Sequence, residues 1–445
     1  MRLPGAQRRR ALLVTDRARL VAAFVIVAST ALLVTYASTW LRLDRINQER
    51  SDFAYAYVGG QIWREGHGDK LYDAAVDKAY YDRDVAPNAQ VDLPFIDAPT
   101  AAPLLAPFTL VDIRTGWRLW SGLQLVLLLA ALVIASRSAR WQPRTPRDSL
   151  LAAALAGAAG AGTYVLAIQG QWSGLLALGL ALAHAACSRG RNFIGGALLT
   201  VTLLSIKPNF AIGAAVFLVG WRERRLVAGA VAGAAGVVLA SLLVAGPAGC
   251  LGFLRTVAES TQSWPWSSMN SASGLVASWF GDNGTTATIG LVACLLAATS
   301  AYPFGRAVAR DISRLDVAFA GAVAATLLAS PHLYHHDLTL LAPALVWGTA
   351  AASRLDHAAT ARAGRRGQAT MLVFGLWGVF TVVALQQLGA PLIGFPGRLV
   401  PWVIGAMLVL ALVACRTSQR RRRDRAGLAG LLPADAPTLR PARDG

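Results

Sequence analysis

The 445-residue chain is 55% hydrophobic and only 15% charged, whereas soluble domains carry about 25% charged residues. The charges are segregated, and uncharged stretches such as Leu20–Trp40, Leu226–Gly246 and Leu399–Cys415 approach or reach the roughly 20 residues that cross a bilayer. These Ala/Leu/Val/Gly runs lack the alternation of barrel strands, and only helices or closed barrels satisfy their backbone groups in lipid. The composition therefore excludes a soluble protein and predicts an all-α polytopic membrane protein.

The net charge of +18 comes from Arg clusters that separate the apolar runs. These clusters lie at 8–10, 137–147, 189–191, 222–225, 306–314, 362–366 and 420–423. Short cationic loops stay in the cytoplasm, so the clusters set the topology and do not indicate a nucleic-acid partner. We expect a multi-pass protein of a bacterial-type plasma (inner) membrane, with both termini cytoplasmic and membrane lipids as its surroundings.

The expected spans alternate consistently when the Arg clusters are placed inside. We expect helices near 20–40, 117–136, 150–168, 172–187, 226–246, 287–304, 316–330, 338–353, 369–387 and 399–415. Two shorter apolar stretches, 193–206 and 209–220, flank Lys207-Pro208-Asn209 and are expected to form a bent or half-depth pair. The predicted bundle has about 11–13 transmembrane helices over residues 20–415. A basic N-terminus (1–19) and a basic, disordered tail (416–445) are expected at its cytoplasmic side.

The segment 41–116 is expected to be a large external loop that follows the first helix. It holds twelve of the 24 acidic residues against eight basic ones, so it is acidic within a basic protein. Within it, Asp52–Arg64 reads as an amphipathic helix lying along the membrane surface with its aromatic residues at headgroup level. Residues 98–110 are apolar but hold three prolines, which predicts a broken or re-entrant helix. A second external loop is expected at 247–286.

Asp52 is the first candidate for chemistry, since it stands just beyond the first span at the start of the amphipathic helix. A carboxylate there suits a general base that acts on a substrate held at the membrane interface. The same position also suits a structural carboxylate that stabilises the helix N-terminus.

Lys207 is the second candidate, as one of only three lysines and the only one within an apolar region. A charge at membrane depth is costly and is usually paired or faces an aqueous cavity. It can bind a phosphate as a point charge, or it can be a helix-end lysine that reaches the outer headgroups.

Three of the six histidines, His332, His335 and His336, fall within five positions. Their spacing is not that of familiar metal motifs and no Cys or Glu completes a ligand set, so we expect no metal site. Imidazoles that hydrogen-bond a phosphate or sugar are one interpretation, and polar loop residues without a role are the other. Further candidates for lining a substrate cleft are Tyr55, Tyr72, Trp264, Trp266 and Asn270, although tryptophans near span ends are mostly interface anchors.

Four ordered motifs resemble glycosyltransferase family 87, the polyprenyl-phosphate-sugar-dependent membrane enzymes with a GT-C fold. They are Asp52-Phe53-x-Tyr55-x-Tyr57-x-Gly59-Gly60 with Leu71-Tyr72, Ala98-Pro99-Thr100 through Pro107, Ile206-Lys207-Pro208, and Ser330-Pro331-His332 with His335-His336-Asp337. One departure is Asp97, which stands where the family pattern usually has an aromatic residue before the proline.

The resemblance implies a GT-C-like bundle and a mannosyltransferase-like reaction on the outer face. A sugar, expected to be mannose, would pass from a polyprenyl-phosphate donor to a hydroxyl of a lipid-linked or envelope glycan. Asp52 would act as the base with inversion at the sugar carbon. Lys207 and one of His332, His335 and His336 would stabilise the donor phosphate, with no cofactor.

Two other classes remain open from the sequence. A lipid or polysaccharide transporter without catalysis would carry titratable residues within its spans to couple ions, but the long helices here are almost free of Asp, Glu and Lys. A non-catalytic scaffold for envelope assembly is the third class, and the acidic, aromatic-rich external segment favours a substrate cleft over it.

Overall fold

The computed structural model describes residues 4–86, 95–142, 145, 147–363, 367–389 and 399–430, and these residues form helices and connecting turns without a strand. The N-terminal part comprises α1 (Pro4–Arg42), α2 (Arg45–Glu49), α3 (Asp52–Arg64), η1 (Gly68–Lys70), α4 (Ala74–Asp84), α5 (Ala101–Leu105), η2 (Ala106–Leu110), α6 (Ile113–Ser138), α7 (Arg147–Ala158), α8 (Ala161–Gln169) and α9 (Ser173–Ser188). The central part comprises α10 (Asn192–Leu204), η3 (Pro208–Phe210), α11 (Ala211–Trp221), α12 (Arg224–Ser263), η4 (Trp266–Ser268) and α13 (Ala272–Phe280). The remaining elements are α14 (Gly284–Thr299), α15 (Tyr302–Arg310), η5 (Ile312–Arg314), α16 (Leu315–Ala329), η6 (His335–Leu340), α17 (Leu341–Ala363), α18 (Gln368–Gly389) and α19 (Leu399–Gly430).

Eight helices of the described part are long and apolar enough to cross a membrane, and α7 with α8, bent by 44°, make a ninth span. Four shorter apolar elements, α5–η2, α9, α10 and η3–α11, accompany them, and α9 packs on α6 and α10 on α12. The all-α polytopic membrane class is confirmed, and eight or nine helices of the described part have the length of a span, against the 11–13 expected. Residues 416–430 continue α19, and residues 431–445 of the expected disordered tail lie outside the described residues.

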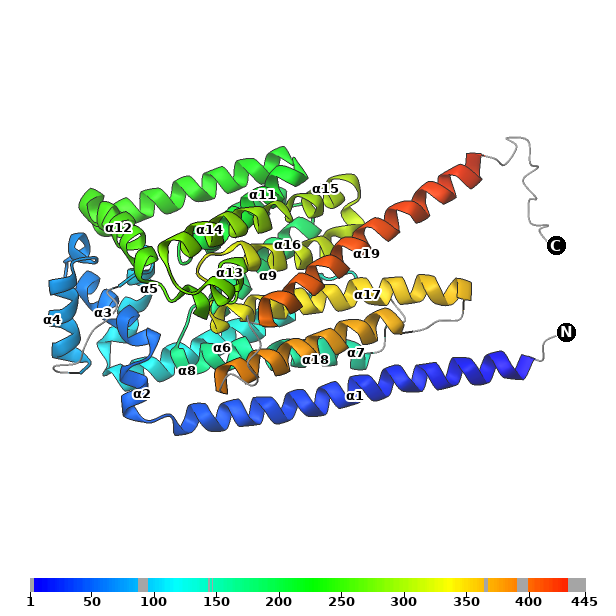
Figure 1. Ribbon diagram of the computed structural model, residues 1–445, viewed down its shortest axis with the longest axis horizontal. Coiled ribbons are helices and arrows are strands. Elements are labelled where there is room, and N and C mark those ends of the chain that lie inside the picture. Colours follow the sequence, from blue (N-terminus) through cyan, green and yellow to red (C-terminus); the bar gives the residue numbers. More distant parts are fainter. Residues whose placement is uncertain are drawn as a thin grey trace, which may run out of the picture.

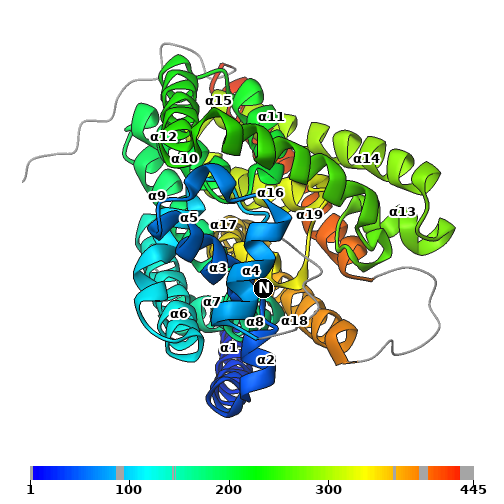
Figure 2. The same ribbon diagram turned by 90° about the vertical axis from the view of Figure 1, so that its left-hand side faces the viewer.

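The bundle has two distinct ends. The short helices α2 to α5 gather at one end, whereas α1 begins and α19 ends at the other (Figure 1). Viewed from the α2–α5 end, α16 and α17 lie near the middle of the bundle and α1 at its edge (Figure 2). The burial of the spans agrees with these positions. Of the most apolar stretch of each span, 83% of the residues are buried in α16 and 78% in the span that contains α17, but only 17% in α1.

The helix α3 has the bounds expected from the sequence, but its surroundings differ. Nine of its thirteen residues are buried, including Tyr57 and Ile62, and it packs against α4, α5, η2 and α6. The expectation that its aromatic residues lie at headgroup level is therefore wrong for Tyr57, because protein covers the helix on most sides. Residues 98–110 form the broken helix that was expected, as α5 and η2. The expected loop 247–286 is largely helical, since α12 continues beyond a bend at Gly246 and is followed by η4 and α13.

A buried ion-pair network joins four elements at the end of the bundle opposite α2–α5. The Asp316 carboxylate at the start of α16 accepts hydrogen bonds from His184 Nε2 of α9 at 3.0 Å and from the Arg354 guanidinium of α17 at 2.6 Å. It also accepts one from the backbone N–H of Arg140, just after α6, at 3.0 Å. The His184 ring stacks on Trp347 with ring centroids 4.5 Å apart. The network therefore fixes the packing of α6, α9, α16 and α17.

Replacing Asp316 with alanine removes the acceptor that these three donors share. We expect the free energy of unfolding to fall by about 3–5 kcal/mol, because the Arg354 charge is left without its buried partner. The measurement is the melting temperature of the purified protein in one detergent. Asp148→Ala, in the exposed first turn of α7, is the control and should melt like wild type. Equal melting of the Asp316 variant would contradict a structural role for the network.

Candidate active site

Asp52 begins α3 and is held by the turn between α8 and α9. Its backbone N–H donates to Gln169 Oε1 at 3.0 Å, and Gln171 Nε2 donates to Asp52 Oδ2 at 2.6 Å. The side chain keeps 39% of its surface exposed. No hydrogen bond within the described part of the chain occupies Oδ1. The carboxylate is therefore oriented through one oxygen and accessible through the other.

Gly170 gives that turn its shape. Its φ of +64° is left-handed, a region that costs other L-residues roughly 1–2 kcal/mol. A Cβ at this position would also lie 2.8 Å from the Cβ of Phe53, the neighbour of Asp52. The indole N–H of Trp120 donates to the Gly170 carbonyl at 2.7 Å. The two glutamines therefore reach Asp52 because a glycine lies between them.

Lys207 projects from the break between α10 and η3. Pro208 disfavours helical geometry at the residue before it, and Lys207 has φ −131° and ψ 79°. The Lys207 side chain is 10% exposed, and its Nζ lies 2.8 Å from His336 Nε2 and 2.7 Å from Asp337 Oδ1. An ammonium has three donors, so one N–H has no acceptor among the residues that the structure describes.

His336 connects this ammonium to Asp52. Because an ammonium has only N–H donors, His336 Nε2 accepts, and the network assigns the ring proton to Nδ1. His336 Nδ1 lies 4.0 Å from Asp52 Oδ2, and its Nε2 lies 3.4 Å from Asp337 Oδ2. His336 and Asp337 both belong to η6. The backbone of η6 packs closely on α8 at Gly162, where a Cβ would lie only 2.4 Å from the Thr339 nitrogen. The structure thus brings Asp52, Lys207 and His336 together.

His332 lies beside this cluster in an aromatic group. Its ring stacks on Trp264 with centroids 4.3 Å apart and meets Tyr334 edge-on at 4.9 Å. Asn209, close to Lys207 in sequence, donates to the His332 carbonyl at 2.9 Å. Burial, assisted by the Lys207 charge, lowers the pKa of His332 to about 3. His332 is therefore a neutral hydrogen-bonding group at physiological pH, not a cation.

The other candidates occupy different surroundings. Trp266 is buried and meets Trp264 at 5.5 Å, while the backbone N–H of Asn270 donates to the Leu333 carbonyl at 2.8 Å. Trp266 and Asn270 therefore contact the segment around His332, Trp266 through Trp264 and Asn270 through Leu333. His335 is buried in η6. Tyr55 packs against Tyr81 of α4 with ring centroids 5.7 Å apart. It therefore belongs to the short-helix layer, the group formed by α2–α5 and η1 at this end of the bundle.

Asp97 was given no chemical role from the sequence, yet it lies at this site. Its Oδ2 accepts from the Trp172 indole N–H at 2.8 Å, and its backbone carbonyl accepts from the Tyr72 hydroxyl at 2.7 Å. Burial raises the pKa of Asp97 to about 6, with Lys207 opposing the rise and Asp52 and Asp337 adding to it. The site therefore holds a third carboxylate beside those of Asp52 and Asp337.

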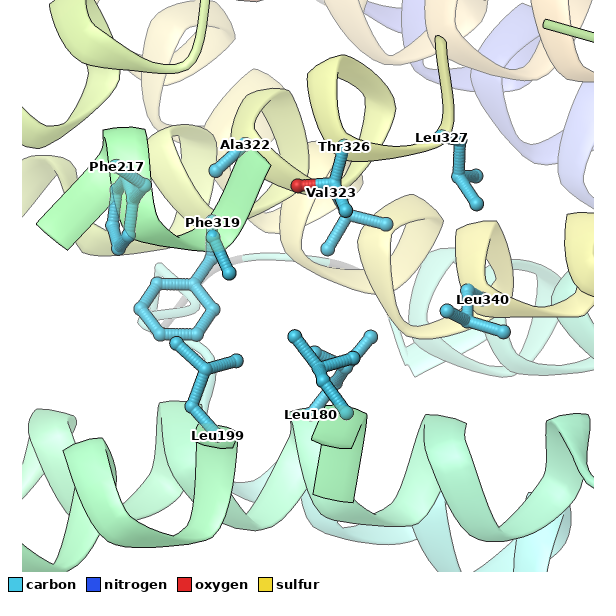
Figure 3. A pocket seen from close by; sticks show the side chains of 11 residues that line it. Leu180, Leu199, Phe217, Phe319, Ala322, Val323, Thr326, Leu327 and Leu340 are labelled. Atoms are coloured by element: carbon cyan, nitrogen blue, oxygen red, sulfur yellow. The ribbon is translucent and has the colours of Figure 1, made fainter. Parts of the chain in front are cut away.

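An apolar layer lies beneath the polar cluster. A cavity of about 30 Å³ is enclosed by side chains of α9, α10, α11 and α16 together with Leu340 (Figure 3). Leu203, one turn before Lys207, and Leu340, three residues after Asp337, both line it. A cavity of this size and lining stays dry, and a low-dielectric floor strengthens the hydrogen bonds above it.

Several residues of the site were missed or given no role: Gln169, Gln171, Trp172, Asp97 and Asp337. Asp337 had a signal, because a carboxylate at the start of an apolar span requires a partner. The glutamines are neutral and stand in an ordinary turn, and no sequence rule singles them out. No group of three or more His, Cys, Asp or Glu side chains within the described ranges is arranged to hold a metal ion.

Replacing Gly170 with alanine should distort the turn that holds Asp52. We expect a loss of at least about 1–2 kcal/mol in the free energy of unfolding, because φ is positive and Phe53 leaves no room for a Cβ. Melting temperature is the readout. Gly122→Ala, in α6 with open space around it, is the matched control and should be neutral or stabilising by up to about 1 kcal/mol. Equal melting of both variants would show that Gly170 is dispensable.

Comparison with known proteins agrees with the resemblance seen in the sequence. A family model, that of glycosyltransferase family 87, matches residues 95–331, just over half of the chain. The match includes Asp97 and Lys207, whereas Asp52 precedes it and His336 follows it. No curated protein sequence matches the chain, and no solved structure matches it. The chain belongs to glycosyltransferase family 87 and is a multi-pass membrane glycosyltransferase.

Proposed function

We propose that the protein transfers a sugar, with mannose as the first candidate, from a polyprenyl-phosphate donor to a hydroxyl of a lipid-linked or envelope glycan. The observation that carries this proposal is the cluster itself. The partly exposed Asp52 carboxylate lies 4.0 Å from the His336 imidazole, and that imidazole accepts a hydrogen bond from the nearly buried Lys207 ammonium. This set can accept one proton and stabilise one anionic leaving group.

Asp52 is the general base of the proposed reaction. Its Oδ1 takes the proton of the acceptor hydroxyl while Gln171 holds Oδ2. The acceptor oxygen forms a bond to the anomeric carbon, and the bond from that carbon to the phosphate oxygen breaks on the opposite face. Polyprenyl phosphate leaves as an anion, and the configuration at the anomeric carbon is inverted. A phosphate ester is a good leaving group, so no second acid, cofactor or metal ion is needed.

Lys207 and His336 are the proposed phosphate ligands. Asp337 neutralises and orients Lys207, so the phosphate meets two prepared donors, the remaining Lys207 N–H and His336 Nδ1–H. Donors fixed in advance lower the barrier because they need no reorganisation when charge develops. The Asp337 carboxylate offsets the free-energy cost of burying the Lys207 ammonium.

An apolar cleft supports a lipid-linked substrate. A space of about 870 Å³ lies between α1 and α6–α8, and its lining includes Trp40, Leu128 and Ala167. Ala167 is two residues before Gln169, so the lining of the cleft extends close to the turn that holds Asp52. The Arg-rich loops favour the cytoplasm for the opposite end of the bundle, and this supports the proposal that the site faces the outside.

Asp52→Asn should lower turnover by about 10²–10⁴-fold, the usual contribution of a general base, with the protein still folded. The assay follows transfer from labelled polyprenyl-phosphate mannose to extracted envelope lipids by purified protein in lipid nanodiscs. Asp69→Asn, an exposed carboxylate of the same short-helix layer, is the control and should leave turnover unchanged. Normal turnover in the Asp52 variant would remove the base assignment.

Two further outcomes bear on the same proposal. Retention of configuration in the product would contradict a single-base displacement. Absence of product from the wild type with every polyprenyl-phosphate sugar tested would contradict the donor class and favour a function in lipid or polysaccharide transport.

A further inference from the structure

Asp97 is the third carboxylate of this site, after Asp52 and Asp337, and the proposed transfer reaction leaves it without a task. Two consecutive residues of the α8–α9 connection hold the carboxylates of Asp52 and Asp97. Gln171 donates to Asp52 Oδ2 at 2.6 Å, and Trp172 donates to Asp97 Oδ2 at 2.8 Å. The two acids are therefore set at a fixed separation along one short stretch of chain.

The backbone around Asp97 is tied toward Lys207. The Thr100 hydroxyl donates to the carbonyl of Ser205, two residues before Lys207, at 2.8 Å. The Tyr72 hydroxyl fixes the Asp97 carbonyl itself. The positive charge of Lys207 lowers the pKa of Asp97 against the effect of burial. Asp97 thus lies near both the proposed base and the proposed phosphate ligand, and the sugar ring of the donor must lie beside these same two groups.

The chemistry of Asp97 selects the kind of group that it can bind. Oδ2 is satisfied by the indole N–H, while no hydrogen bond from the described residues reaches Oδ1 and the residue is partly exposed. An ionised carboxylate only accepts hydrogen bonds, so its partner must be a donor. A phosphate oxygen is an acceptor with like charge and is excluded, whereas a sugar hydroxyl is a donor.

We propose that Asp97 Oδ1 accepts a hydrogen bond from one hydroxyl of the transferred sugar, so that Asp97 determines which sugar the enzyme accepts. This inference rests on the proposed transfer from a polyprenyl-phosphate sugar. A site built to bond a hydroxyl discriminates strongly against an analogue that lacks it, because the carboxylate oxygen, covered by the bound sugar, is then left unpaired.

The test compares donors that differ by one hydroxyl. Purified wild type and Asp97→Ala are assayed with polyprenyl-phosphate mannose and with its 2-, 3-, 4- and 6-deoxy forms. Wild type should prefer the parent over one deoxy donor by about 10- to 100-fold in kcat/KM, the range of a hydrogen bond to a charged group. Asp97→Ala should transfer the parent more slowly by a similar factor and no longer distinguish it from that deoxy donor. A purely structural defect would slow all five donors equally.

Two additional variants keep the test decisive if Asp97→Ala folds poorly. Asp97→Asn keeps the shape of the side chain, and Trp172→Phe keeps an aromatic ring but removes the indole N–H that holds Oδ2, together with part of the ring volume. Both should reduce the preference for the same hydroxyl, whereas Asp69→Asn should retain it. The wild-type preference should also weaken as the pH falls through about 6, where Asp97 takes up a proton.

The two possible failures are distinguishable. An active wild type whose discrimination among the five donors is unchanged in every Asp97 and Trp172 variant would overturn this inference and leave the transfer reaction standing. If the wild type transfers another sugar, the deoxy series is built on that sugar and read in the same way. A wild type that transfers from no polyprenyl-phosphate sugar would overturn both proposals.

Discussion

The buried contact between Lys207 and Asp337 is the constraint on which the geometry of the site depends. Moving an ammonium out of water costs several kcal/mol unless a counter-charge and further hydrogen bonds compensate. Asp337 and His336 supply these at 2.7 Å and 2.8 Å. The two sides of the contact are 130 residues apart in sequence, so the pair fixes the α10–η3 break against η6. The position of η6 then places His336 opposite Asp52, and the Asp52 carboxylate is oriented by a turn that packs on the same elements.

Much of this arrangement was predictable because charge in an apolar sequence is costly and therefore informative. The Arg clusters predicted the order of the spans, and Pro208 predicted the break that presents Lys207. Asp52, Lys207 and the histidines were singled out from positions almost 300 residues apart, and the structure brings Asp52, Lys207 and His336 into one cluster. Their grouping in space was inferred from the family resemblance and from their expected positions at the same end of the bundle. Their chemical roles remain predictions.

The remainder depends on contacts that no local pattern encodes. Gln169 and Gln171 orient Asp52. A neutral amide in a turn can be satisfied by water, so nothing in the sequence indicates that it must contact Asp52. The helix α3 has an aromatic face, and an aromatic face packs equally well at a lipid headgroup region or against other helices. Its burial follows only once α4, α5 and α6 are in place. Asp97 was visible as a departure from a pattern, yet only the Trp172 hydrogen bond shows that its side chain belongs to the site.

Similar side chains lie near the two ends of α16 but have different roles, one structural and one in the proposed binding of substrate. At one end His184, Asp316 and Arg354 form an imidazole, carboxylate and cation group, and at the other His336, Asp337 and Lys207 form another. In the first group Asp316 satisfies three donors, and the His184 and Asp316 side chains are fully buried. Nothing can enter there, so its role is cohesion. In the second group one ammonium N–H has no acceptor among the described residues, and the imidazole Nδ1 lies 4.0 Å from a carboxylate that is 39% exposed. Unused hydrogen-bonding capacity next to an accessible carboxylate, more than residue type, is what separates a site that binds a substrate from a contact that only holds helices together.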